Sequence, residues 1–178
     1  MKRTSTVLLL VFFVGLSTTA KTQSEPTDAQ TPLRAEELKL YSDFLDSFLG
    51  TRSGSGPTNL SDHTVSLILA KDECLQEIGF KISTAPAKTP RLFPASIANG
   101  RSVHLVPPNG HDLKDLQTGL LSLSKIGFDT DHRFAVFTFE LVRSGSNGAT
   151  YREGGTLVFQ KSNDKWIRTN RACLGWIT

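Results

Sequence analysis

Four titratable side chains in the second half of the chain could do acid–base chemistry together. They are His104, Asp129, His132 and Glu140. An imidazole and a carboxylate that meet in a pocket can exchange a proton with a substrate, which is the chemistry of a small hydrolase or isomerase. The sequence contains no Gly-x-Ser-x-Gly elbow and no phosphate-binding glycine loop to accompany them. These four residues are therefore the catalytic candidates of an alternative, enzymatic interpretation.

The histidines do not have the spacing of a metal site. None of the four histidines, His63, His104, His111 and His132, belongs to a His-Glu-x-x-His motif or has another spacing that would place two ligands on one metal from a single element. Asp129 and Asp131, which precede His132, lack the glycine and the distal glutamate of a calcium-binding loop, and turn chemistry accounts for them. We predict that the protein holds no metal ion and no cofactor.

Three aromatic side chains near the C-terminus are the candidates for ligand binding. Tyr151, Trp166 and Trp176 fall in a region of β-strand pattern, where an exposed ring could line a groove. A tryptophan at the start of an edge strand more often fills the end of a core, and this is the alternative interpretation.

The first twenty residues have the pattern of a signal peptide. Lys2 and Arg3 precede an apolar run over residues 7–16, and small residues follow as far as Ala20. The run is shorter than the roughly 20 residues that a membrane-spanning helix needs, and no later run is as apolar for that length. We expect a secreted or periplasmic protein with no membrane span after cleavage of residues 1–20. An uncleaved N-terminal anchor is the alternative.

Export also decides how the two cysteines are interpreted. Cys74 and Cys173 both lie outside the leader, and an oxidising compartment allows a pair of thiols to join and to persist. We predict one disulfide between them. Two buried free thiols are the alternative, because the sequence does not show that the two positions are close in space.

The charge of the exported chain excludes one class of partner. Two of the 20 Lys and Arg residues lie in the leader, which leaves 18 against 17 Asp and Glu. Acidic residues are interleaved with the basic ones toward the C-terminus, so no nucleic-acid footprint is expected. The expected partners are a small ligand or a protein of the cell envelope or the extracellular space. A homodimer built on an exposed sheet face is also compatible with the sequence.

The clearest elements are a helix at the start of the domain and a sheet at its end. Residues 21–30 are polar and predict a flexible linker before a single domain over residues 31–178. Thr31 and Pro32 suit a helix start, and apolar residues then recur at helical spacing until Gly50. Alternating patterns predict a four-stranded antiparallel meander over residues 123–128, 133–142, 155–161 and 165–169.

These patterns together predict an α+β fold in which the N-terminal helix packs on the C-terminal sheet. The apolar stripe of the helix has no partner helix of comparable length. We expect the meander to supply its partner surface, through contacts of Tyr41, Phe44 and Phe48 with Phe137, Phe139, Leu157 and Phe159. Phe134, Val136 and Val142 alternate with the first set, so the second strand is expected to be covered on both faces.

The middle of the chain is ambiguous. Residues 64–69 have a β-like pattern, followed by a helical turn over 74–78, but residues 62–80 could also form one irregular helix. Prolines interrupt residues 81–101 before a short strand over 102–106. After Asp112 we expect a short helix through Leu113, Leu116, Leu120 and Leu121. For residues 59–101 the sequence therefore does not favour one structure over the alternatives.

The order of IGFD, AVFTFE, GGTLVFQKSNDKWI and GWIT resembles the C-terminal meander of uncharacterised secreted bacterial families. It is also distantly similar to nuclear-transport-factor-like and cystatin-like α+β domains, in which a long helix lies on a curved antiparallel sheet. The resemblance covers about residues 120–178. It implies a fold and export but no reaction and no site residue, because families of this shape include enzymes and binding modules.

The sequence thus favours an exported, non-enzymatic domain that binds a small ligand or a protein partner. The alternative is a small exported hydrolase or isomerase, with a His and carboxylate pair in a cavity between helix and sheet.

Overall fold

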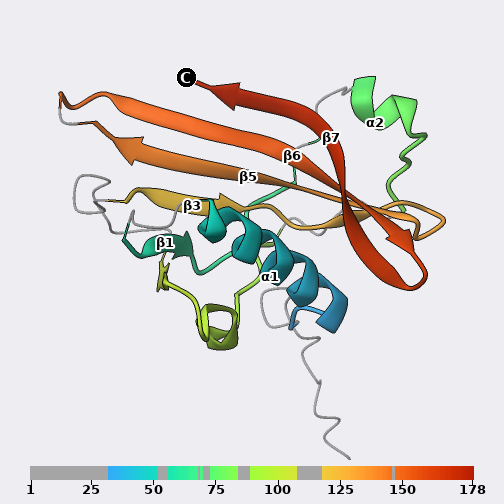
Figure 1. Ribbon diagram of the computed structural model, residues 1–178, viewed down its shortest axis with the longest axis horizontal. Helices are drawn as coiled ribbons and strands as arrows, with labels where there is room; N and C mark the ends of the chain where they lie inside the picture. The colour runs from blue at the N-terminus through green and yellow to red at the C-terminus, as the bar shows by residue number, and fades with distance from the viewer. Residues whose placement is uncertain are drawn as a thin grey trace, which may run out of the picture.

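The computed structural model describes residues 32–51, 56–67, 69, 73–83, 89–107, 118–145 and 147–178, and only the backbone of Glu73, 170–172, Leu174 and Trp176. The proposed signal peptide and linker lie outside these residues. The chain forms α1 (Ala35–Gly50), β1 (Thr58–Ser61), α2 (Glu73–Glu77), the 3-10 turn η2 (Ala95–Ala98), β2 (Val103–Val106), β3 (Leu120–Leu123), β4 (Gly127–Phe128), β5 (Phe134–Ser144), β6 (Thr150–Ser162) and β7 (Lys165–Ile177). Figure 1 shows α1 crossing one side of the sheet, with α2 on the other side.

The strands form one mixed sheet. Its order is β2-β1-β3-β5-β6-β7, and β4 pairs separately with β5. β1 is parallel to both of its neighbours, whereas β3, β5, β6 and β7 pair in antiparallel fashion. The α+β class is therefore confirmed, but the predicted meander of about four strands is only part of a seven-stranded sheet. Strand β2 lies within the short strand predicted over 102–106. Strand β1 was missed, because parallel pairing joins segments far apart in sequence, which a local pattern does not reveal.

The predicted helix exists, but it begins later than Thr31 and Pro32 suggested. The residue that precedes its first turn is Arg34, and the Arg34 backbone N–H donates to the Glu37 carboxylate over 2.7 Å. This bond satisfies a donor at the helix end that has no partner within the helix. Glu37 is nearly buried and also pairs with Arg91, at 2.9 Å. The start of α1 is thus set by a charged contact between distant segments.

Aromatic rings fill the layer between α1 and the sheet, as predicted. Phe44 lies 5.7 Å from Phe137 and 5.3 Å from Phe139, measured between ring centroids, and Phe48 lies 5.9 Å from Phe139. Tyr41 is buried among them, and its hydroxyl donates to the Ser124 carbonyl over 2.8 Å. The same buried cluster includes Leu157 and Phe159.

The opposite face of the sheet is covered by α2 and the segments around it. Val136, Val158 and Cys173 form a second buried cluster with Leu75, and Phe134 packs against it. Cys74 and Cys173 form a disulfide with their Cα atoms 5.5 Å apart, which confirms the predicted pairing. The prediction that β5 is covered on both faces is therefore confirmed.

The ambiguous middle segment has neither of its two predicted forms in full. The helical turn is present as α2, whereas the described residues of the β-like run form a single bridge, between Val65 and Ser124. The predicted run over 123–128 is split because Lys125 donates its N–H to the Val65 carbonyl instead of continuing the ladder with β5. The helix expected after Asp112 falls mostly outside the described residues, and Leu120 and Leu121, which it was to include, lie in β3.

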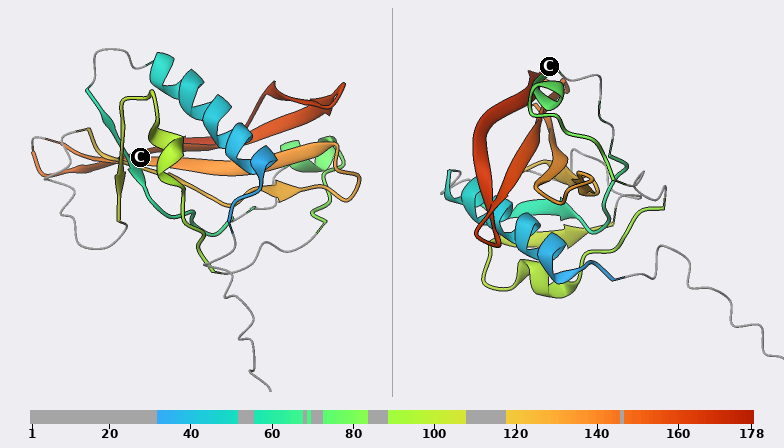
Figure 2. Two further views of the ribbon diagram at one scale, coloured as in Figure 1. Left: turned by 90° about the horizontal axis from the view of Figure 1, so that it is seen from below. Right: turned by 90° about the vertical axis from the view of Figure 1, so that its right-hand side faces the viewer.

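The long hairpin of β5 and β6 runs the length of the sheet (Figure 2), and two glycines shape its turn. Gly145 donates its N–H to the Ala149 carbonyl over 2.7 Å, and Gly148 adopts a φ of 78°, which glycine tolerates best. Among the described residues, no helix is long and apolar enough to cross a membrane.

Candidate functional site

The four catalytic candidates occupy different parts of the structure. His104 is exposed on β2, whereas Glu140 is half-buried on β5, where it pairs with Arg152 at 3.3 Å. Asp129 is buried, and its carboxylate accepts the backbone N–H groups of Arg133 and Phe134. Asp129 therefore holds a turn together, which is a common use of aspartate.

His132 has a carboxylate partner that the sequence did not suggest. Its Nε2 lies 3.0 Å from Oε2 of Glu36, in the first turn of α1. The imidazole stacks on Phe128, with ring centroids 4.8 Å apart, and meets the edge of Trp166 at 5.5 Å. Trp166 is half-buried and packs against the main core, as in the alternative interpretation of this tryptophan. Glu36 was missed because its distance from His132 depends on how α1 crosses the sheet.

A second imidazole and carboxylate pair lies just after β1. Nδ1 of His63 is 2.5 Å from the Asp62 carboxylate, and the Ser61 hydroxyl donates to the His63 carbonyl over 3.0 Å. Ser61 is buried, and its hydroxyl donates to a backbone carbonyl and not to the imidazole. Ser61, Asp62 and His63 therefore have the residue types of a hydrolase triad without its geometry. Among the described residues, no group of His, Cys, Asp and Glu could hold a metal ion.

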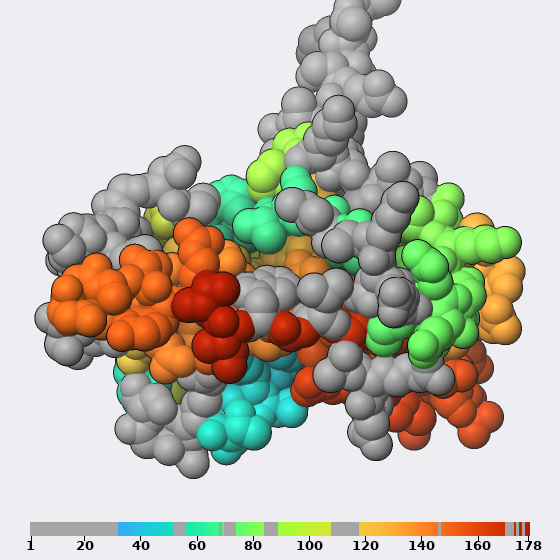
Figure 3. All heavy atoms as spheres, turned by 90° about the horizontal axis from the view of Figure 1, so that it is seen from above, coloured from blue at the N-terminus to red at the C-terminus, as the bar shows by residue number. Residues whose placement is uncertain are grey.

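Tyr151, a predicted ligand-binding residue, lines a pocket near the turn of the β5 and β6 hairpin. The pocket has a volume of about 350 Å³, and its lining consists of Arg143, Ser144, Tyr151, Arg152, Glu153 and Ile177. Figure 3 shows this end of the hairpin, in orange, beside the red end of β7. Tyr151 is 50 % exposed and Ile177 is 84 % exposed. The volume falls within the range of small-ligand sites.

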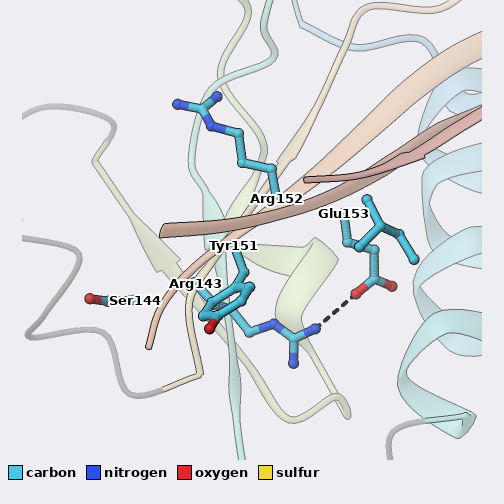
Figure 4. Close-up of a pocket in the computed structure, with 6 residues that line it drawn as sticks. Arg143, Ser144, Tyr151, Arg152 and Glu153 are labelled. Carbon is cyan, nitrogen blue, oxygen red and sulfur yellow. Dashed lines mark hydrogen bonds and ion pairs between the residues drawn. The ribbon is translucent and has the colours of Figure 1, made fainter. Parts of the chain in front are cut away.

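The strand register places the lining residues. Arg143 pairs with Tyr151 across the hairpin, and Glu153 pairs with Ile177 on β7. Because successive side chains alternate between faces, Arg143, Tyr151 and Glu153 point to one side, whereas Arg152 points to the other. Figure 4 shows this separation, with Arg152 directed away from the other labelled side chains. Trp176, the third aromatic candidate, pairs through its backbone with Gly154, and its side chain lies outside the described residues.

Two lining side chains rest directly on glycines. A Cβ atom at Gly145 would lie 2.5 Å from a ring carbon of Tyr151, and one at Gly119 would clash with the stem of Arg143. A larger residue at Gly145 would displace the Tyr151 ring, whereas one at Gly119 would also meet the Val142 carbonyl group, and Gly119 has a φ of 79°. The backbone at Gly145 and Gly119 therefore contacts Tyr151 and Arg143 and limits where these two side chains can lie.

The charges of the pocket are paired. Arg143 Nη2 lies 2.8 Å from the Glu153 carboxylate, an ion pair that Figure 4 marks with a dashed line. Arg152 reaches Glu140 on β5. These side chains are one third to one half exposed, so each pair contributes little to stability and can exchange partners with a ligand. Arg143, Arg152 and Glu153 were missed because their roles depend on the hairpin register.

No family model matches this chain, and comparisons with curated proteins and with solved structures find no match.

Proposed function

We propose that this protein is an exported, non-enzymatic binding domain, and that the pocket beside Tyr151 is its ligand site. The observation that carries the proposal is a pocket of about 350 Å³ that combines an exposed aromatic ring with paired charged groups. Such a combination suits a ligand with both an apolar face and polar groups. Export is supported by the signal-peptide pattern and by the disulfide, which oxidising compartments favour.

The alternative function, a small hydrolase or isomerase, has one observation in its favour, the pair of His132 and Glu36. The proposed catalytic cavity between helix and sheet has no comparable support, because the rings of Tyr41, Phe44 and Phe137 contact one another there. His132 also has its imidazole packed against two aromatic rings, which suits a structural contact between α1 and the β4–β5 turn. We therefore favour binding over catalysis.

The experiment that tests the binding function is a screen of small fragments by NMR on ¹⁵N-labelled protein. We expect saturable shifts in the backbone amides of Arg143, Tyr151 and Glu153, and loss of these shifts in Tyr151→Ala. Ile167→Ala is the matched control, because Ile167 is a similarly exposed apolar residue of β7 that does not line the pocket. The proposal would be contradicted if fragments caused the same shifts in Tyr151→Ala, or if no fragment gave saturable shifts at millimolar concentration.

A further inference from the structure

The chemistry of the pocket beside Tyr151 narrows the class of ligand. Taking the proposed binding function as given, we infer that this pocket binds a neutral carbohydrate through the face of Tyr151 and the paired side chains of Arg143 and Glu153.

The first argument is the charge balance. On the face that carries Tyr151, the charged lining side chains Arg143 and Glu153 form one ion pair, so their charges cancel. Arg152, which points to the opposite face, is paired with Glu140. A site for a strongly anionic ligand would leave an arginine without a nearby carboxylate, since a carboxylate repels the ligand and competes with it for the guanidinium. Cancelled charges favour a ligand that is itself neutral.

The second argument is the pattern of donors and acceptors. The Arg143 guanidinium only donates hydrogen bonds, and the ionised Glu153 carboxylate only accepts them, yet the two lie 2.8 Å apart. A sugar hydroxyl both donates and accepts, so neighbouring hydroxyls can engage both side chains. Charge-assisted hydrogen bonds of this kind are stronger than bonds between neutral groups.

The third argument is the exposed ring. The face of an aromatic ring carries partial negative charge, and the C–H groups on one face of a sugar ring carry partial positive charge. Tyr151 is half exposed and lies on Gly145, so its ring is held in place before a ligand arrives. A ring that is already positioned loses little conformational freedom on binding.

These three features separate a carbohydrate from two other ligand classes. A purely apolar ligand would leave Arg143 and Glu153 without new partners and would cover their hydrogen-bonding groups. An anion would need Glu153 to move away from Arg143. Of these three classes, the neutral, hydroxyl-rich ligand is the one that uses the aromatic face and both charged groups as they stand.

The test is an NMR titration of the purified protein, with its disulfide intact, by the methyl glycosides of glucose, galactose and mannose and by N-acetylglucosamine. Sodium acetate and sodium sulfate serve as anionic probes. We expect at least one sugar to give saturable shifts at Arg143, Tyr151 and Glu153 in the millimolar range, because a monosaccharide has few atoms with which to offset the cost of binding. Acetate and sulfate should give no saturable shift there.

Four variants distinguish the arguments, and a fifth serves as the control. Tyr151→Ala should weaken sugar binding about tenfold or more, and Tyr151→Phe should retain more affinity than Tyr151→Ala, because it keeps the aromatic face. Gly145→Ala should weaken binding by displacing the ring while leaving it in the protein, and Gly145 has no positive φ that would make alanine unfavourable. Glu153→Gln leaves Arg143 without this carboxylate partner and should create sulfate binding that the parent lacks. Ile167→Ala should leave sugar binding unchanged.

The outcomes separate this inference from the proposed function. If library fragments bind at Tyr151 but no sugar does, the pocket is a ligand site and the carbohydrate inference is overturned. If acetate or sulfate binds the parent as tightly as the sugars, the charge-balance argument fails. If neither fragments nor sugars bind, the proposed function fails as well. Thermal melts of each variant confirm that a loss of binding does not come from unfolding.

Discussion

Phe137 is the ring on which the aromatic side chains of α1 and β6 converge. It is fully buried, and its ring centroid lies 5.2 Å from Tyr41, 5.7 Å from Phe44 and 5.6 Å from Phe159. Phe137→Ala should lower the free energy of unfolding by about 3–5 kcal/mol, because the cavity lies between packed elements that cannot close over it. Denaturant melts check this value, with Ile167→Ala, an exposed residue, expected to cost about 0.5 kcal/mol or less. Equal stabilities for the two variants would rule out this packing.

Glu37 carries the charge that fixes the beginning of α1. Its side chain is 6 % exposed and that of Arg91 is 15 % exposed, and the nearest atoms of the two groups are 2.9 Å apart. Glu37→Gln should lower the free energy of unfolding by about 3 kcal/mol, because it removes a charge partner from the nearly buried guanidinium of Arg91. Partial exposure of Arg91 keeps this loss at the low end of the range for buried pairs. The exposed pair of Lys39 and Asp43 provides the control, and Asp43→Asn should cost less than about 1 kcal/mol. If urea melts gave the two variants the same loss, the buried pair would have no special role.

Tyr41, beside this pair, is a buried neutral residue whose hydroxyl has a hydrogen-bond partner. Burial, and to a smaller extent the charge of Glu37, raises the pKa of Tyr41 well above its ordinary value. The phenol therefore stays protonated and donates to the Ser124 carbonyl. A buried hydroxyl with a partner avoids the cost of an unsatisfied polar group, which explains how a tyrosine can occupy the centre of the core.

The site could be predicted from the sequence only one residue at a time. Tyr151 was a candidate because an aromatic ring in a terminal β region can line a groove, and this residue does line the pocket. Arg143 and Glu153 are ten positions apart and become neighbours only through the register of the hairpin. A register follows from the turn, and the turn between β5 and β6 did not have the short form that fixes pairing from sequence.

At the scale of elements, α1 is fastened at its second half to the chain that follows η2. Arg101 donates to both carboxylate oxygens of Asp46, over 2.6 and 2.9 Å, and also to the Ile97 carbonyl. This hydrogen-bonded arginine lowers the pKa of Asp46 below its ordinary value. The carboxylate form is therefore favoured more in the folded protein than in the unfolded chain.

The pH dependence of stability follows from this shift. A carboxyl group with a lowered folded-state pKa stabilises the protein above its unfolded pKa, about 3.9, and the contribution disappears as the pH falls through the folded value. Asp46→Asn should lower the free energy of unfolding by about 0.5 kcal/mol at pH 7, a small loss because Asp46 is largely exposed. The loss should disappear once the pH lies below the pKa of Asp46 in the folded protein. Thermal melts of parent and variant between pH 7 and pH 2 measure the difference. A difference that grows toward acid pH would contradict the assigned direction.

Elements were predictable where the pattern was long and local. The hairpin strands β5 and β6 have 11 and 13 residues, and a strand was predicted within each of them. Asn163 and Asp164, both with positive φ, form the turn that was expected before β7. By contrast, β1 has four residues, too few to establish a period, and it was missed, whereas the equally short β2 was predicted as a strand over 102–106. Their positions depend on parallel pairing of Asn59 with both His104 and Leu120, which no local rule specifies.

At the scale of the whole molecule, the sheet separates two unequal hydrophobic clusters. The larger cluster lies between α1 and the sheet, and the smaller one lies beneath α2 on the other face. The disulfide joins α2 to β7 across the smaller cluster, and its two cysteines are 99 positions apart. Because α2 has only five residues and a small apolar surface, packing alone would not hold it on the sheet, and the disulfide keeps it in place.

Reduction of the disulfide should therefore act on the two faces to different degrees. Paired replacement of Cys74 and Cys173 by serine removes a crosslink that closes a loop of about 100 residues, for which a loss of about 2–4 kcal/mol is typical and about 4.7 kcal/mol is the chain-entropy value. That loss corresponds to a fall in Tm of roughly 5–15 °C. We also expect hydrogen exchange to accelerate first at Gly79 and Phe80, whose N–H groups bond within the α2 segment, and least at Phe137 in the main core. Exchange measured by NMR on oxidised and reduced protein separates the two faces. If Phe137 lost protection as early as Phe80, the sheet would not divide the molecule into a cover held by the disulfide and a core held by α1.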